Sequence, residues 1–240
     1  MTDVSINETE QKTPDVNART SQASDNTRKV VQIKNELYGM STVTIKPGIP
    51  DFNRFLTARN RSVIRGFDDV SIAISSLFRT VNAVRHPELV QAIQDWFNEL
   101  HDENNLMKEN LEHHIATIHV DESDPFFSST EFSPFRFESV QLNFNNQNTM
   151  RFYKHIFEMN NLLTQMYKFN SLGQLPVSDY NVMAHNIIRS LNMYIERVKK
   201  TLNVSRRVKG AYSPDEFIEK VKQYKSVQAY IAAELSGKRR

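Results

Sequence analysis

Polar and apolar residues alternate in a short stretch that begins at residue 42, and this alternation predicts a β-strand. Thr42, Thr44 and Lys46 fall on one face of the strand, because strand side chains point alternately to opposite faces. Val43 and Ile45 fall on the other face. A lone strand cannot satisfy its own backbone hydrogen bonds, so we expect it to have a partner strand.

Two partners for this strand fit the sequence. The same strand of a second chain would complete a two-stranded ribbon shared between subunits. Such a ribbon fits the major groove of B-DNA, where Thr and Lys side chains reach base edges and phosphates. Alternatively, Val31 and Ile33, with Gln32 and Lys34 on the opposite face, would pair with the strand as a hairpin across residues 35–40.

Apolar residues at helical spacing follow the strand and predict two helices. Pro50 and Asp51 suit the start of the first helix, whose apolar positions are Phe52, Phe55 and Leu56. Gly66 with Asp68 predicts a helix boundary. The second helix is strongly apolar, with Val70, Ile72, Ala73, Ile74, Leu77, Phe78 and Val81. This order of strand, helix and helix resembles the ribbon-helix-helix DNA-binding module.

The rest of the chain shows mostly helical periodicity. One predicted helix opens at Pro87 and is followed, after a polar break at residues 102–105, by renewed helical spacing from Leu106. Alternation at residues 135–144 predicts a strand or hairpin, and further helices follow it. The last helix starts at Ser213-Pro-Asp-Glu216 and runs to about Leu235. The expected fold class is mostly α with a minor β component (α+β), with a ribbon-helix-helix-like N-terminal module packed on a helical body.

Composition divides the chain into four parts. Residues 1–28 contain too few apolar side chains to offset the entropy of ordering, so we expect a disordered tail. Residues 29–82 hold the ribbon-helix-helix-like DNA-binding segment, residues 83–235 the helical body with one strand or hairpin near 135–144, and residues 236–240 a basic tail. No apolar run approaches the length of a membrane span. Cysteine is absent, which excludes disulfides and thiolate chemistry and fits a cytoplasmic protein.

The formal net charge of +2 conceals a strong segregation of charge. Residues 42–65 carry five cations against one acid, a net of +4, and residues 197–240 carry twelve against four, a net of +8. Residues 66–196 between them carry eight cations against seventeen acids, a net of −9. Basic segments on both sides of an acidic middle favour a polyanion-binding surface over the alternative of merely solvated faces.

These patterns give a set of candidate DNA-binding residues. We expect Thr42, Thr44 and Lys46 to approach the groove, Arg59, Arg61 and Arg65 to hold the backbone, and Arg206, Arg207 and Lys209 to extend the footprint. One feature opposes this arrangement. Asp68 and Asp69 fall near the predicted N-terminus of the second helix, where carboxylates satisfy the helix dipole but repel DNA.

The sequence offers little support for catalysis. Its glycines form no phosphate-cradling loop. Glu109 and His113 lie four residues apart, as two zinc ligands on a helix would, but no second ligand cluster supports them, so a solvated face is favoured. We therefore expect no catalytic residues, no metal and no cofactor, and no small-molecule ligand is evident.

Three segments of the chain form a recognisable set. The first is Arg-Asn-Arg-Ser-Val-Ile-Arg-Gly at 59–66, before the apolar helix. The second is Ser-Pro-Phe-Arg-Phe at 133–137, before a strand and a helix that ends in Phe-Asn-Ser-Leu-Gly at 169–173, and the third is Ile-Arg-Ser-Leu at 188–191 followed by Val-Ser-Arg-Arg-Val at 204–208. In their order and spacing these segments resemble the AcaB-like proteins encoded by conjugative plasmids and integrative conjugative elements. The resemblance spans roughly residues 40–240. It implies a transcriptional regulator, an activator of conjugative transfer genes, that binds double-stranded DNA, and we expect a homodimer. The alternative is a helical accessory protein of a transfer or secretion assembly.

Overall fold

The computed structural model describes residues 40–57, 61–81, 83–118, 125, 129–131, 133, 135–204 and 214–236. Every helix and strand named below belongs to the unit Ser41–Arg240. The tail predicted over residues 1–28 and the hairpin predicted with residues 31–34 lie outside the described residues.

Two strands form an antiparallel pair at one side of the helices. β1 (Ser41–Ile45) pairs with β2 (Val140–Phe144), with Thr42 opposite Asn143 and Thr44 opposite Gln141. The predicted strand is therefore present, but its partner within the described residues is β2 of the same chain, a pairing that neither of the two expected partners included. β2 provides that partner because its own alternation gives a matching apolar face far downstream in the sequence.

α2 (Pro50–Thr57) and α3 (Arg61–Thr80) follow β1. The boundary predicted at Gly66 is wrong, because Gly66 lies inside α3. A Cβ atom there would lie 3.2 Å from Cγ2 of Ile195, so the missing side chain allows α3 to pack closely on α7 (Val177–Thr201).

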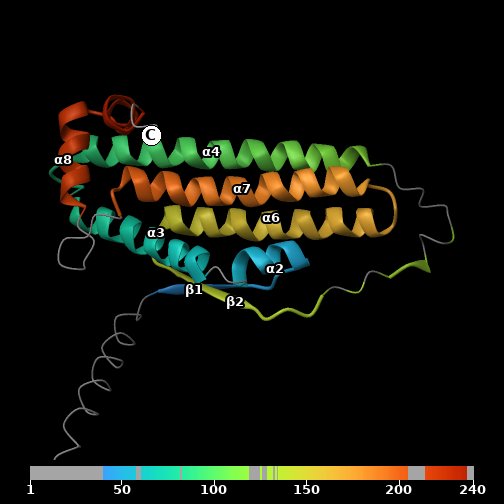
Figure 1. The fold of residues 1–240 in the computed structure, drawn as a ribbon. Helices are drawn as coiled ribbons and strands as arrows, with labels where there is room; N and C mark the ends of the chain where they lie inside the picture. Colours follow the sequence, from blue (N-terminus) through green and yellow to red (C-terminus); the bar gives the residue numbers. More distant parts are fainter. Residues whose placement is uncertain are drawn as a thin grey trace, which may run out of the picture. The chain divides into compact units, whose positions relative to one another are not determined.

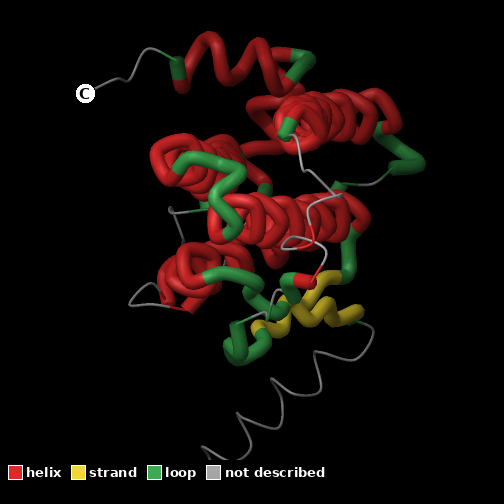
Figure 2. Tube along the Cα trace, turned by 90° about the vertical axis from the view of Figure 1, so that its right-hand side faces the viewer, coloured by secondary structure: helices red, strands yellow, loops and turns green. Residues whose placement is uncertain are grey.

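α4 (Pro87–Thr117), α6 (Gln147–Ser171) and α7 are the long helices, and they run alongside one another (Figure 1). Seen at right angles, the strands lie at one side of the helical stack (Figure 2). The break predicted at residues 102–105 is absent, since α4 is continuous there. That segment is polar but contains neither Gly nor Pro, and polarity alone does not end a helix.

The C-terminal part departs from the prediction of one long helix. It consists of α8 (Asp215–Tyr224), α9 (Val227–Tyr230) and the π-helix η1 (Ile231–Leu235). Lys225 adopts the left-handed conformation, with φ of 62°, and ends α8. The Ser226 hydroxyl then accepts a hydrogen bond from the backbone N–H of Ala229 and starts α9. None of the helices in the described part is both long and apolar enough to cross a membrane.

The core is centred on a series of aromatic contacts that joins four helices. Phe55 of α2 packs edge-on against Phe67 of α3, with ring centroids 6.0 Å apart, and Phe67 packs on Phe152 of α6 at 5.8 Å. Phe152 stacks on Tyr194 of α7 at 3.9 Å. All four side chains are buried, so these contacts fix α2, α3, α6 and α7 relative to one another.

The connection between β1 and α2 lies closely against α6. The backbone N–H of Gly48 donates to Oδ1 of Asn160 at 3.0 Å, and Nδ2 of Asn160 donates to the carbonyl of Lys46 at 3.1 Å. A Cβ atom on Gly48 would lie 1.8 Å from Oγ1 of Thr164. Only glycine therefore permits this approach of the backbone to α6.

We expect the substitution Gly48→Ala to lower the free energy of unfolding by about 1–3 kcal/mol, the usual cost of overpacking. Urea denaturation measures the change. The double variant Gly48→Ala/Thr164→Ala should recover part of the loss, because it removes Oγ1 while Cβ of Thr164, at 2.9 Å, remains. A Gly48→Ala protein as stable as the wild type would contradict the close approach.

Two buried histidines lie in the contact between α4 and α6, His101 on α4 and His155 on α6. Burial, with the nearby charge of Arg151, lowers the pKa of His101 to about 4. Burial, with the charge of Lys108, lowers the pKa of His155 to about 4. Both imidazoles are therefore neutral at pH 7 in the folded protein.

These lowered pKa values make stability depend on pH. An unfolded histidine takes up a proton near pH 6.5, whereas these two do so only near pH 4, so the unfolded state gains stability as pH falls through this window. We expect a loss of up to about 3 kcal/mol for each histidine. Chemical denaturation at pH 7.5 and pH ~4.5 should show a shallower loss for His101→Gln/His155→Gln than for the wild type. Replacing the exposed His113 by Gln should leave the wild-type slope, and an unchanged slope in the double variant would refute the assignment.

Candidate nucleic-acid interface

The outer face of the β1–β2 pair is polar. Thr42 and Thr44 are exposed on β1, and the register places Asn143 and Gln141 opposite them on the same face. Lys46 is exposed just beyond the end of β1. The structure thus brings together the three residues predicted to approach the groove and adds two amide side chains from β2.

The sequence pattern contained the signal for these two amides. Val140, Leu142 and Phe144 alternate as the apolar face of β2, so Gln141 and Asn143 necessarily occupy the opposite face. The strand predicted at residues 135–144 does not by itself indicate which strand it pairs with. Only the pairing with β1 shows that both polar faces form one surface.

A hydrogen bond across the strands orders this surface. The Thr42 hydroxyl donates to Oδ1 of Asn143 at 2.8 Å and orients the amide. Beneath it, Ile45 and Leu142 are fully buried. The polar outer face is therefore supported from beneath by buried apolar side chains.

Tyr153 of α6 strengthens the support from below. Its ring packs edge-on against Phe144, with centroids 6.1 Å apart, and its hydroxyl donates to the carbonyl of Phe67 at 3.2 Å. Burial, followed by the charge of Asp68, raises the pKa of the Tyr153 hydroxyl well above its usual value. The group stays protonated and keeps its hydrogen bond at neutral pH.

α3 lies along the edge of β2 that does not pair with β1. The Ser71 hydroxyl donates to the carbonyl of Asn143 at 3.1 Å, and one turn later the Ser75 hydroxyl bonds to the side chain of Asn145. α3 therefore runs in the same direction as β2 where they touch. Its first turn lies toward the Lys46 end of the strand pair and contains no acidic residue, so no carboxylate of that turn offsets the partial positive charge of the helix N-terminus.

Asp68 and Asp69 do not lie at the N-terminus of α3, where they were expected to repel DNA. α3 begins at Arg61, so both carboxylates lie inside the helix and not at its N-terminus. Asp69 forms an ion pair with Lys199 of α7 at 3.7 Å.

Several predicted cationic residues lie where their side chains are not described. Arg61 and Arg65 are in the first turns of α3, toward the Lys46 end, but only their backbone is described. Arg59, Arg206, Arg207 and Lys209 lie outside the described residues. Arg136 is an additional candidate: it is exposed and precedes Val140, which pairs with Ile45 at that same end.

The side chains on this face have the chemistry of base recognition. Asn and Gln amides pair with adenine N6 and N7, Lys donates to guanine O6 and N7, and Thr contacts either base edges or the thymine methyl. A two-stranded ribbon has the right width for the major groove. Among the described residues, no group of three or more His, Asp or Glu side chains is placed to hold a metal ion.

No protein-family model matches the chain, and no curated protein matches its sequence. The fold is similar to one seen in the crystal structure of selenomethionine-containing AcaB from uropathogenic E. coli. The TM-score is 0.54 at 10% sequence identity, and the similarity covers 75% of this chain and 97% of AcaB. At this identity the similarity concerns the fold.

Proposed function

We propose that this chain is a DNA-binding transcriptional regulator that places the outer face of its β1–β2 pair in the major groove. One observation carries the proposal: Thr42, Thr44, Gln141 and Asn143 form a polar face on a rigid apolar support. Lys46 extends this face, and the N-terminal turn of α3 points to the same end. The role is non-enzymatic and cytoplasmic.

The proposed target is the set of genes for conjugative transfer, which the regulator activates. The sequence resemblance to AcaB-like regulators supports this target, and so does the fold similarity to AcaB. A reporter fused to transfer-gene promoters tests it, because an activator raises reporter output and a variant with the ribbon face disabled does not.

We also propose that the regulator binds DNA as a homodimer. Within the described residues the sheet has two strands, so β1 has one edge without a partner. An apolar hollow of about 230 Å³ lies between the apolar face of the strand pair and α6, lined by Val43, Phe144, Met150 and Phe157. A second copy that adds its own β1 would pair this edge and cover the hollow.

The first test separates base recognition from phosphate binding. Thr44→Ala and Gln141→Ala should weaken binding to a selected site by about 1–3 kcal/mol more than binding to random duplex, since base contacts carry the discrimination. Arg61→Ala and Arg65→Ala should weaken both and flatten the log–log salt slope by about one unit each. Fluorescence anisotropy at several salt concentrations measures both effects.

Gln165→Ala, an exposed glutamine on α6, is the matched control for Gln141→Ala and should bind like the wild type. If the ribbon variants bind normally while Arg206→Ala or Arg207→Ala abolishes binding, the C-terminal basic segment is the DNA contact. If none of these changes matters, the protein is an accessory component of a transfer or secretion assembly.

The second test concerns the dimer. Analytical ultracentrifugation should show a dimer at micromolar concentration, and Met150→Glu should dissociate it by placing a charge in the hollow. Met193→Glu is the control. Met193 of α7 is 51% exposed, similar to Met150 at 41%, but it does not line this hollow. A wild-type protein that stays monomeric at high concentration would favour the hairpin with residues 31–34 instead.

A further inference from the structure

A second polar feature lies in the helical body, in a hollow of about 190 Å³ between α4 and α6. Its lining includes Asn104, Lys108, Arg151, Lys154, His155 and Glu158. The ribbon does not use these residues, and no sequence motif groups them. Their arrangement nevertheless has the properties of a binding site.

The floor of the hollow contains buried polar atoms without partners. His155 is only 4% exposed, and neither of its ring nitrogens has a hydrogen-bond partner among the described residues. Asn104 is 8% exposed, and its Nδ2 is likewise unpaired. Buried polar groups without partners are costly, and a bound ligand that supplies acceptors would satisfy them.

The walls of the hollow carry excess positive charge. Glu158 is the single carboxylate of the lining and is shared by Lys108 at 3.5 Å and Lys154 at 3.8 Å. Arg151 donates to Oδ1 of Asn98, a neutral amide, at 2.8 Å. Lys108 also forms an ion pair with Glu112 at 3.6 Å, but three cations against these two acids still favour an anion over a metal ion.

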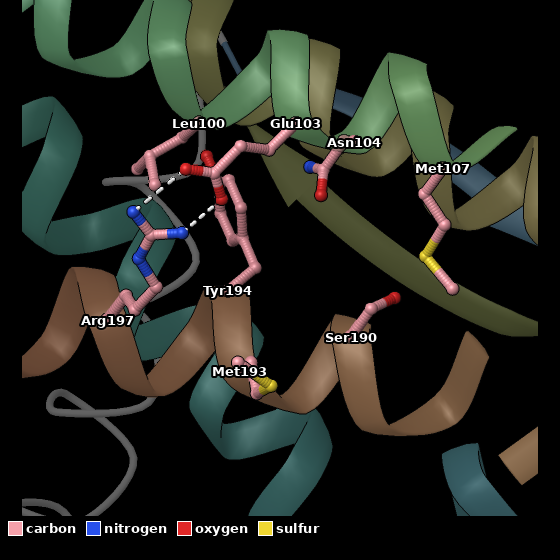
Figure 3. Close-up of a pocket in the computed structure, with 8 residues that line it drawn as sticks. All are labelled: Leu100, Glu103, Asn104, Met107, Ser190, Met193, Tyr194 and Arg197. Carbon is pink, nitrogen blue, oxygen red and sulfur yellow. Dashed lines mark hydrogen bonds and ion pairs between the residues drawn. The ribbon is translucent and has the colours of Figure 1, made fainter. Parts of the chain in front are cut away.

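The neighbouring hollow on the α4–α7 side also contains unpaired polar atoms, Nδ2 of Asn104 and the Tyr194 hydroxyl, but it differs in its charge. It measures about 110 Å³, and Asn104 lines both hollows. Figure 3 shows Asn104 reaching from α4, and Tyr194 from α7, into the space between these two helices. Glu103 and Arg197 close this side with an ion pair, so its charges are already balanced. The site for an added anion is therefore on the α6 side.

We propose that the hollow between α4 and α6 binds a small dianionic oxyanion, either inorganic phosphate or the phosphate group of a small metabolite. Asn104 and the His155 ring would donate hydrogen bonds to its oxygens. Lys108, Arg151 and Lys154 would neutralise its charge through charge-assisted contacts. The volume suits a phosphate group with few further atoms.

The test is phosphate binding to the full chain, measured by calorimetry and by the imidazole NMR signals of its seven histidines. Inorganic phosphate and glycerol phosphate are titrated separately, with chloride at matched ionic strength as the reference. Phosphate should shift the signals of His101 and His155 but not that of His185, which is exposed on α7. The two titrations distinguish a free anion from a phosphate monoester as the source.

Arg151→Gln and Lys154→Ala should each weaken phosphate binding about tenfold or more, because each removes a charge-assisted contact. Lys168→Ala is the matched control, an exposed lysine on the same helix, and should leave binding unchanged. Lys154 is 71% exposed, so its variant will fold even if others do not. The proposal fails if neither compound shifts the His155 signal beyond chloride, or if binding persists undiminished in the Lys154→Ala protein.

Discussion

The pairing of β1 with β2 determines the rest of the proposed interface, because it joins two polar faces from distant parts of the chain. Two strands of five residues are only marginally stable alone. This pair is held on three sides: Ile45 and Leu142 are buried beneath it, Asn160 fixes the chain where it leaves β1, and Ser71 covers the edge of β2. The polar residues on its outer face are therefore positioned by contacts in which they take little part, which leaves them available to a ligand.

Local periodicity was sufficient to predict most of the helices but not how they end or pack. The apolar spacing after Pro50 and after Pro87 corresponds to α2 and α4, because amphipathic helices are encoded by neighbouring residues. Gly66 was interpreted as a boundary because glycine disfavours helix, yet it lies inside α3, where its small size permits contact with α7. Lys225 ends α8 in a left-handed conformation that lysine seldom adopts, so no propensity could indicate it.

The sequence predicts only part of the candidate site, again because local patterns do not show which segments pack together. Thr42, Thr44 and Lys46 follow from the alternation of one strand, whereas Gln141 and Asn143 join them only through a long-range pairing. The apolar spacing predicts a start of the second helix near Asp68 and Asp69, whereas α3 begins at Arg61 and contains both carboxylates. The polar hollow between α4 and α6 could not be predicted, since His101, Asn104 and His155 become neighbours only when the two helices pack together.

α6 connects the two polar features of the molecule. Tyr153 and Asn160 support the β1–β2 pair and its connection, while Arg151 and His155 line the hollow on the side of α4. Lys154 lines both this hollow and the apolar one beside β1. An anion held between α4 and α6 would influence DNA binding only if it favoured one position of α6 over another. By linkage, DNA would then change the affinity for the anion by the same factor, so the coupling is measurable from either ligand.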